Sequence, residues 1–183
     1  MPESRAPVCL GQGELLLRPW QAGDLAALVA NANHVEVVRG LSSRFPHPYR
    51  EEDGRAFLAG QVVPLDRWAL AICRDGQACG GIAITPGTGE RQGTASLGYW
   101  LGPSHWNQGL MGRVLALYVP WVMADAGLHR LLAEVMEHNS ASARVLLRHG
   151  FVEEGCARRA VRKDGVLRDL RRFVWLQPVS SGL

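Results

Sequence analysis

The feature that most constrains the fold is a change of pattern near residue 109. Residues 94–101, TASLGYWL, form an apolar stretch of strand length, and a polar loop follows them. Over 109–126 the apolar residues recur at helical spacing. Two glycines, Gly109 and Gly112, stand where this helix begins, although glycine costs roughly 1 kcal/mol relative to alanine inside a helix. The unit predicts a chain that mixes strands and helices and raises the question of what the glycines do.

Segments on both sides of this unit predict further strands and helices. Apolar alternation marks the strands, helical spacing marks the helices, and Gly, Pro and Asn mark their ends. The order of elements predicts a mixed α/β (α+β) sheet rather than a doubly wound one. The expected elements are a strand over 14–20, a helix after Asp24, a proline-stiffened loop over 44–49, a helical region over 50–63, strands over 67–73, 78–85 and 94–101, a helix over 109–126, a strand over 129–136, a helix over 139–150 and a hairpin over 151–176.

Three local expectations refine this outline. The Asp24 side chain is expected to cap the first helix. Pro120 is expected to kink or split the helix over 109–126. The strand over 129–136 is almost entirely apolar, which suits a sheet interior covered on both faces.

Length and composition predict one globular domain over residues 1–183, with its core over 14–176. The chain is 47% hydrophobic and has no run of 18 apolar residues, so no transmembrane helix and no membrane partner are expected. Its N-terminal stretch lacks the basic-then-apolar order of a secretory signal. The four cysteines show no CxxC spacing, which predicts reduced thiols in a cytoplasmic protein and no metal site.

The net charge of +3 is unevenly distributed. Residues 144–172 hold eight arginines and one lysine against four carboxylates, so this segment alone carries +5. One interpretation is a solvated surface with many ion pairs. The other is attraction for an anion, such as a phosphate-bearing cofactor, an acidic protein or nucleic acid, because arginine can donate two parallel hydrogen bonds to phosphate.

The start of the helix at 109 also has two interpretations. The first amides of a helix lack partners within it and together carry about half a positive charge, so they can bind phosphate. Gly109 and Gly112 would then clear the approach, and Gln108 and Arg113 would add donors. Alternatively, the glycines serve a tight turn and close packing of the helix. The spacing alone does not separate the two.

Three stretches occur in order at close spacing: LGYWLGPSHWNQGLMGRVL from residue 97, LHRLLAEVMEHN from 128 and NSASARVLLRHGF from 139. Together they resemble the GNAT N-acetyltransferases, particularly the RimJ/RimL-like branch that acetylates ribosomal-protein N-termini. The resemblance covers about residues 14–176. Its most specific pieces are LGYWL, NQGLMG, Asn139-x-x-Ser142, RHGF and EGC.

The resemblance implies the GNAT acyl-CoA N-acyltransferase fold, a central, mostly antiparallel sheet flanked by helices and splayed between strands 94–101 and 129–136. Acetyl-CoA would lie in that opening as co-substrate, without a metal. Its pyrophosphate would bind the amides of 108–113, and its pantetheine would extend the sheet. The implied cofactor-binding residues are Tyr99, Trp100, Leu101, Gln108, Gly109, Leu110, Met111, Gly112, Arg113 and Asn139.

The chain departs from the family pattern at several positions. The phosphate loop usually reads Arg/Gln-x-x-Gly-x-Gly/Ala, but Trp106 holds its first position and Met111 its last, with Gly112 one place later. The backbone amides remain, so binding is expected to persist with shifted contacts. Val161 stands where the ribosomal-protein branch has a glutamate, so that base does not carry over, and Pro120 is unusual for this helix.

Two side chains are candidates for catalysis. Ser142 matches the family position that protonates the leaving thiolate, and its alternative role is a first-turn serine that bonds backbone. Glu134 is a candidate base, because burial would raise its pKa; its alternative role is an ion pair with Arg130 or Arg144.

Other proton acceptors stay open. Glu137 and His138 follow at the end of the same strand. Water-mediated removal is a further route, because an α-amine has a pKa near 8 and about a tenth of it is neutral at pH 7. Backbone amides near Leu101 could polarise the thioester carbonyl.

The acceptor side is expected at the loop over 44–49. Phe45, His47 and Tyr49 lie on this stiff loop, in the region where the family receives its acceptor amine. Each of the three rings could instead pack against the first helices.

The leading hypothesis is an acetyl-CoA-dependent N-acetyltransferase that acts on a protein or peptide N-terminal α-amine, or on a small-molecule amine, by direct attack on the thioester. The alternative is a non-catalytic CoA-binding GNAT-fold sensor or interaction module. A nucleic-acid-binding module is disfavoured, because no aromatic-interleaved motif accompanies the basic segment. A homodimer is compatible with these features.

Overall fold

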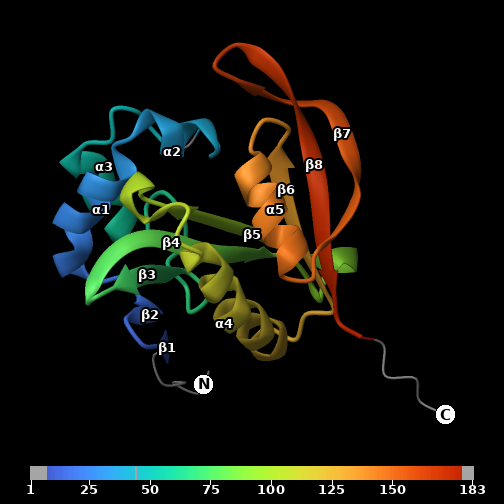
Figure 1. The fold of residues 1–183 in the computed structure, drawn as a ribbon, viewed down its shortest axis with the longest axis horizontal. Coiled ribbons are helices and arrows are strands. Elements are labelled where there is room, and N and C mark those ends of the chain that lie inside the picture. Colours follow the sequence, from blue (N-terminus) through green and yellow to red (C-terminus); the bar gives the residue numbers. More distant parts are fainter. Residues whose placement is uncertain (1–7, 44, 179–183) are drawn as a thin grey trace. The chain divides into compact units, whose positions relative to one another are not determined.

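The computed structural model describes residues 8–43 and 45–178 (Figure 1). The chain divides into two compact units. The first unit runs to Ala83 and includes Tyr99–Leu110. The second comprises Ile84–Gly98 and the chain from Met111 onward.

Eight strands form one sheet in the order β1-β2-β3-β4-β5-β6-β8-β7. Antiparallel pairing joins β1 to β2, β2 to β3, β3 to β4, β6 to β8 and β8 to β7, whereas β5 and β6 are parallel. The predicted mixed, mostly antiparallel sheet is therefore confirmed. The strands are β1 (Leu10–Gln12), β2 (Leu15–Pro19), β3 (Leu70–Arg74), β4 (Gln77–Pro86), β5 (Thr94–Leu101), β6 (Arg130–Met136), β7 (Val152–Lys163) and β8 (Val166–Leu176).

The parallel pairing of β5 with β6 is short. It covers three residue pairs, from Thr94–Arg130 to Ser96–Leu132, although both strands continue further. β6 keeps β8 as its antiparallel partner along its whole length. Divergence of the two strands beyond these pairs stays a prediction.

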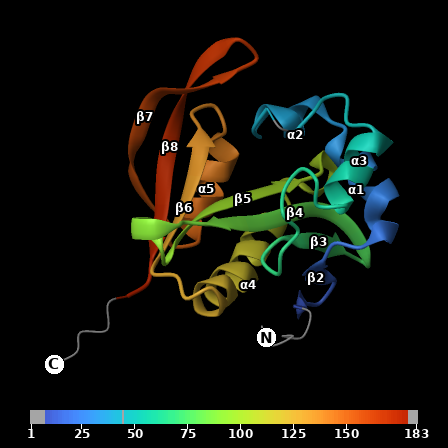
Figure 2. The same ribbon diagram turned by 180° about the vertical axis from the view of Figure 1, so that it is seen from behind.

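Three helices belong to the first unit: α1 (Leu25–Ala32), α2 (Val35–Arg39) and α3 (Glu51–Leu58). α1 and α3 lie side by side in Figures 1 and 2. Gly54 permits this approach, because a Cβ there would lie 2.7 Å from Leu25 Cδ1 and 3.2 Å from Val29 Cγ2. The sequence predicted α1 and α3 but not the short elements β1 and α2.

The loop between α2 and α3 supplies part of the core of this unit. Leu28, Ala32 and Tyr49 are buried together, and Phe45 packs against them. The loop is non-helical as predicted over its described residues, whereas Arg44, the first residue of the predicted loop, lies outside the described part of the chain.

The second unit contains most of α4 (Leu110–Asp125) and all of α5 (Ser140–Arg148). Pro120 was expected to kink or split this helix; α4 is one continuous helix, so a split is excluded, and Pro120 lies on its exposed side. Both views show α5 beside the β7–β8 hairpin (Figures 1 and 2). No helix in the described residues has the length and apolarity needed to cross a bilayer.

β6 is buried on one face only. Leu131, Ala133 and Val135 are buried, whereas Glu134, between them, is exposed. The expectation of two covered faces is therefore wrong, because alternate residues of this strand meet different environments.

Asp24 does not cap α1 with its side chain, which corrects the prediction. Its carboxylate instead accepts hydrogen bonds from Arg18 Nη1 at 2.8 Å, Arg18 Nη2 at 2.7 Å and the Gln21 backbone N–H at 2.9 Å. Burial alone would raise the pKa of Asp24, but the bonds from Arg18 and Gln21 outweigh it, so the pKa lies below its ordinary value.

Replacing Asp24 by alanine is expected to lower the free energy of unfolding by about 3 kcal/mol, because Arg18 would keep a mostly buried charge without this partner. Urea denaturation measures the loss. Glu51→Ala, which removes the exposed partner of Arg55, is the control and should cost less than about 1 kcal/mol. Equal losses in the two variants would contradict the assignment.

The same pair predicts an acid dependence of stability. The pKa of Asp24 is lower in the folded than in the unfolded chain, so its contribution is complete above the ordinary pKa of 3.8. It is lost as the pH falls through the lower, folded value. The stability difference between the wild type and Asp24→Ala should therefore shrink at the acid end of a pH series.

Candidate active site

The loop between β5 and α4 enters the helix through residues with left-handed backbone conformations. Asn107 has a φ of +57° and Gly109 a φ of +72°, values that glycine and asparagine tolerate best. A Cβ at Gly109 would meet nothing within 4 Å in the described part of the chain. Gly109 thus serves the turn by its backbone and adds no side chain in front of the first amides of α4.

Gln108 stabilises this loop with both ends of its side chain. Its Nε2 donates to the Ser104 carbonyl oxygen at 2.7 Å, and its Oε1 accepts a hydrogen bond from Arg74 Nη1. The side chain that the sequence suggested as a phosphate donor is therefore engaged within the protein. Arg74, at the end of β3, was missed, because a single arginine before an Asp-Gly turn has no distinctive pattern.

Trp106 and Gly102 fasten the same loop within the first unit. The Trp106 indole N–H donates to the Leu101 carbonyl oxygen at 2.8 Å, and the Gly102 N–H donates to the Cys79 carbonyl oxygen at 2.8 Å. A Cβ at Gly102 would lie only 2.0 Å from Asn31 Oδ1. Trp106, which departs from the family pattern, thus has a structural role in this loop.

Gly112 has a packing reason for being glycine. A Cβ there would lie 2.6 Å from Nε2 of His149, the residue that follows α5 as its C-cap. For this position the close-packing interpretation is supported by an observed neighbour. The two glycines at the helix start therefore serve different purposes.

The end of β5 is held by glycines of the neighbouring strand. A Cβ at Gly80 would lie 2.2 Å from the Trp100 carbonyl oxygen, and a Cβ at Gly81 would lie 3.0 Å from Trp100 Nε1. These two glycines allow β4 to lie close to Trp100, and they were not singled out from the sequence. The signal that could have found them is the Gly-Gly pair inside a strand.

The first turn of α5 is fixed by its N-cap. Asn139 Oδ1 accepts a hydrogen bond from the Ser142 backbone N–H at 3.1 Å, which confirms the predicted cap. Ser142 is half-buried in this turn. The Asn139 side chain, expected near the cofactor, therefore has a defined structural partner.

Glu134 is not buried, which corrects the premise for a raised pKa. Its side chain is 37% exposed, and its Oε1 accepts from Arg172 Nε at 2.9 Å. The partner is thus Arg172 rather than Arg130 or Arg144. Glu134 is therefore engaged in an exposed ion pair instead of being buried.

Glu137 is no better placed as a base. Desolvation acts to raise its pKa, but its own backbone N–H and Arg168, at 3.1 Å, together outweigh this effect and hold the pKa below the ordinary value. His138 Nδ1 lies 3.9 Å from the Glu137 carboxylate. These contacts stabilise the ionised form of Glu137.

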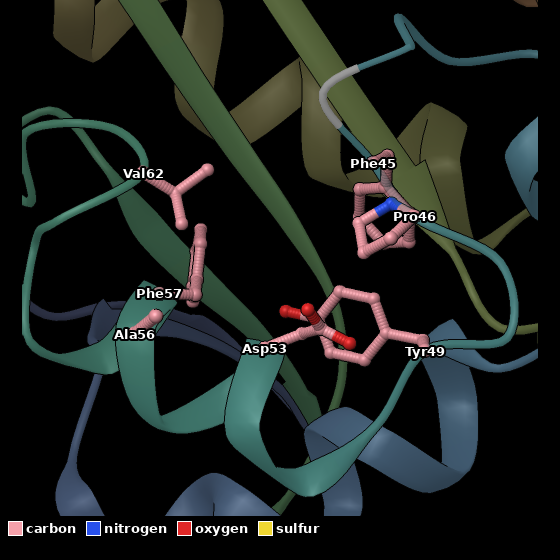
Figure 3. Close-up of a pocket in the computed structure, with 7 residues that line it drawn as sticks. All are labelled: Phe45, Pro46, Tyr49, Asp53, Ala56, Phe57 and Val62. Atoms are coloured by element: carbon pink, nitrogen blue, oxygen red, sulfur yellow. The ribbon is translucent and has the colours of Figure 1, made fainter.

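The predicted acceptor loop divides into two parts. The rings of Phe45 and Tyr49 pack with their centroids 5.0 Å apart, and Tyr49 is buried, whereas His47 is exposed. Phe45 and Tyr49 line a pocket of about 290 Å³, to which α3 and Val62 contribute the other wall (Figure 3). Asp53 and Phe57, also in this lining, were not singled out from the sequence.

Ion pairs engage three arginines of the basic segment. Arg171 donates two hydrogen bonds of 2.7 Å to Glu153, and Arg168 and Arg172 pair with Glu137 and Glu134. Arg130, which lies outside the segment, pairs with Glu154. This pattern supports the solvated-surface interpretation.

Within the described residues no group of three metal-binding side chains comes together, and the four cysteines are free.

Comparison with known proteins gives a consistent result. A family model described as an acetyltransferase (GNAT) domain matches residues 14–152. The Bacillus subtilis "Probable N-acetyltransferase YjcK" is 39% identical over 85 residues, 46% of this chain and 47% of that protein. The Escherichia coli ribosomal-protein-serine acetyltransferase is 36% identical over 67 residues, 37% of each chain. The matched stretch thus spans less than half the length of these two relatives.

A solved structure shows the same fold. Mycobacterium smegmatis RimJ, in complex with CoA-disulfide, superposes with a TM-score of 0.78. The match covers 93% of this chain and 86% of that chain at 24% identity.

Gly112→Ala should destabilise the protein by about 1–3 kcal/mol, because the new methyl group must displace the His149 ring. In the background of His149→Ala the same substitution should cost less, since the obstructing ring is gone. A double-mutant cycle in urea measures the coupling. Equal costs of Gly112→Ala in both backgrounds would contradict the packing role.

Proposed function

The chain belongs to the acetyltransferase (GNAT) family, and on that premise we propose that it transfers an acetyl group from acetyl-CoA to a primary amine. The acceptor is a protein or peptide N-terminal α-amine or a small-molecule amine. The name of the E. coli relative, a ribosomal-protein-serine acetyltransferase, supports the first of these.

The free thiols and these relatives also favour a cytoplasmic location.

The observation that carries the proposal is the start of α4. Gly109 turns the chain into the helix with a left-handed backbone and no neighbour within 4 Å of a Cβ position among the described residues. Helix N-terminal amides without a covering side chain suit a pyrophosphate. We therefore assign the amides from Gln108 to Arg113 to the cofactor's phosphates, and the backbone of Tyr99, Trp100 and Leu101 to its pantetheine.

Acetyl-CoA, when bound, supplies the acetyl group as a thioester whose thiol has a pKa near 8.5. Ser142 is the proposed acid: its Oγ–H gives the leaving sulfur a proton, and the Oγ regains a proton from water, which receives the proton of the amine. Asn139 positions it, because the bond to the Ser142 N–H fixes the first turn of α5. Backbone N–H groups near Leu101 are proposed to polarise the carbonyl.

For the proton of the amine, the contacts favour transfer to water. Glu134 is exposed and paired with Arg172, and the pKa of Glu137 is lowered. A neutral fraction of about a tenth at pH 7 lets an α-amine attack without a dedicated base.

Thiol release from acetyl-CoA in the presence of peptides, polyamines and arylalkylamines tests the activity. Turnover with an amine is the expected result. Coenzyme A binding without turnover on any amine would instead support the non-catalytic alternative.

Ser142→Ala should lower kcat by about 10²-fold, the scale of general acid catalysis, with little change in the KM for acetyl-CoA. Ser140→Ala, in the same helical turn, is the matched control and should retain the wild-type kcat. An unchanged kcat in Ser142→Ala would remove this residue as the acid.

Glu134→Gln should retain kcat within about threefold across pH 6–9, whereas loss of a general base costs about 10²-fold or more. Steady-state rates with one acceptor amine measure this. A large loss that is confined to one limb of the pH profile would restore Glu134 as the base.

A further inference from the structure

The pocket beside α3 is built entirely within the first unit. Phe45 and Pro46 form one side, Ala56, Phe57 and Val62 form the other, and Tyr49 and Asp53 lie between them (Figure 3). Six of the seven lining residues are aromatic or otherwise mainly apolar. Asp53 is the one charged member of this lining.

The size of the pocket suits a bulky group. An engineered apolar cavity of about 150 Å³ is large enough to bind benzene, so a pocket of about 290 Å³ can hold an aromatic ring together with its linker. A methyl group would leave most of this apolar surface without contact, and affinity grows with the apolar area that is buried.

Asp53 provides charge complementarity for an amine, which is a cation in neutral solution. Its carboxylate is held in place because Oδ2 accepts the Arg50 backbone N–H at 2.8 Å. Tyr49 adds no second charge, because burial and the nearby Asp53 carboxylate raise its pKa to about 12. The pocket thus combines one fixed negative charge with apolar walls.

The pocket adjoins the strand end assigned to the cofactor. The Phe45 ring lies 5.5 Å, centroid to centroid, from the Trp100 ring of β5. An amine held at this wall is therefore close to the strand that would carry the pantetheine arm.

We propose that this pocket selects acceptor amines that bear a bulky apolar group and no neighbouring carboxylate, with Asp53 binding the ammonium. The proposal rests on the function above and makes the acceptor class specific. Amines with small side chains would leave the pocket unfilled, and free amino acids would bring a carboxylate close to Asp53. Asp53 acts here in recognition: it binds the protonated amine, which gives its proton to water, as proposed above, before the neutral amine attacks the thioester.

Binding measured without turnover tests the pocket directly. Phenylalanine amide, alanine amide and free phenylalanine are titrated calorimetrically into the protein saturated with coenzyme A. Phenylalanine amide should bind about tenfold or more tightly than either of the others. Equal affinities for the two amides, or no detectable binding of phenylalanine amide, would overturn the proposal.

Two variants with matched controls locate the contacts. Asp53→Asn keeps a hydrogen-bond acceptor for the Arg50 N–H but loses the charge, so it should weaken phenylalanine amide binding about tenfold. Glu52→Gln, an exposed neighbour outside the pocket lining, should leave binding unchanged. Equal effects of the two would contradict a role for Asp53.

Ala56→Leu fills the pocket and should weaken phenylalanine amide at least tenfold while sparing alanine amide. Ala59→Leu, on the exposed end of the same helix and outside the lining, is its control. Parallel loss of both amides in Ala56→Leu would overturn the pocket assignment.

Acetyl transfer is then measured with phenylalanine amide and with a peptide that has an N-terminal phenylalanine. The comparison shows whether the bulky apolar group in the pocket comes from a small amine or from a peptide. Transfer to neither, with the binding order intact, would refute the proposed enzyme activity and leave the pocket's selectivity standing.

Discussion

The position of Trp100 in β5 depends on two glycines, Gly80 and Gly81, in the neighbouring strand β4. A Cβ at Gly80 would come within 2.2 Å of the Trp100 carbonyl oxygen, and a Cβ at Gly81 within 3.0 Å of its indole nitrogen. Glycines at both places therefore allow β4 and β5 to approach at this point. Because the Trp100 ring then meets Phe45, one backbone constraint sets both the strand end proposed for the cofactor and a wall of the pocket proposed for the acceptor.

The helix start illustrates how one sequence pattern can combine two physical requirements. Gly109 is needed for a backbone with φ of +72°, whereas Gly112 is needed because His149 lies 2.6 Å from its Cβ position. The first requirement concerns the chain's own conformation, and the second concerns packing against another helix. The second glycine stands one residue later than in the family pattern. Because it serves packing, this shift is consistent with an unchanged set of backbone amides in the first turn of the helix.

The order of the major elements could be predicted because it follows from local patterns. The long hairpin turns at Asp164 and Gly165 as the sequence indicated, and Asn139 caps α5. Predictions that depended on a partner elsewhere in the chain were less successful. Asp24 binds Arg18 instead of capping α1, and Glu134 is exposed beside Arg172. No local pattern identifies which arginine a carboxylate will meet.

The basic segment shows why formal charge alone is a poor guide to a binding partner. Its count of +5 includes arginines whose partners, Glu134 and Glu137, lie outside the segment on and just after β6, so the field of the folded surface is weaker than the count implies. Interactions of such exposed pairs are also screened by salt within about 10 Å. Recognition of an anionic cofactor must then depend on short-range donors with fixed directions. Backbone amides at the start of α4 meet that requirement, because the helix sets their orientation before any ligand arrives.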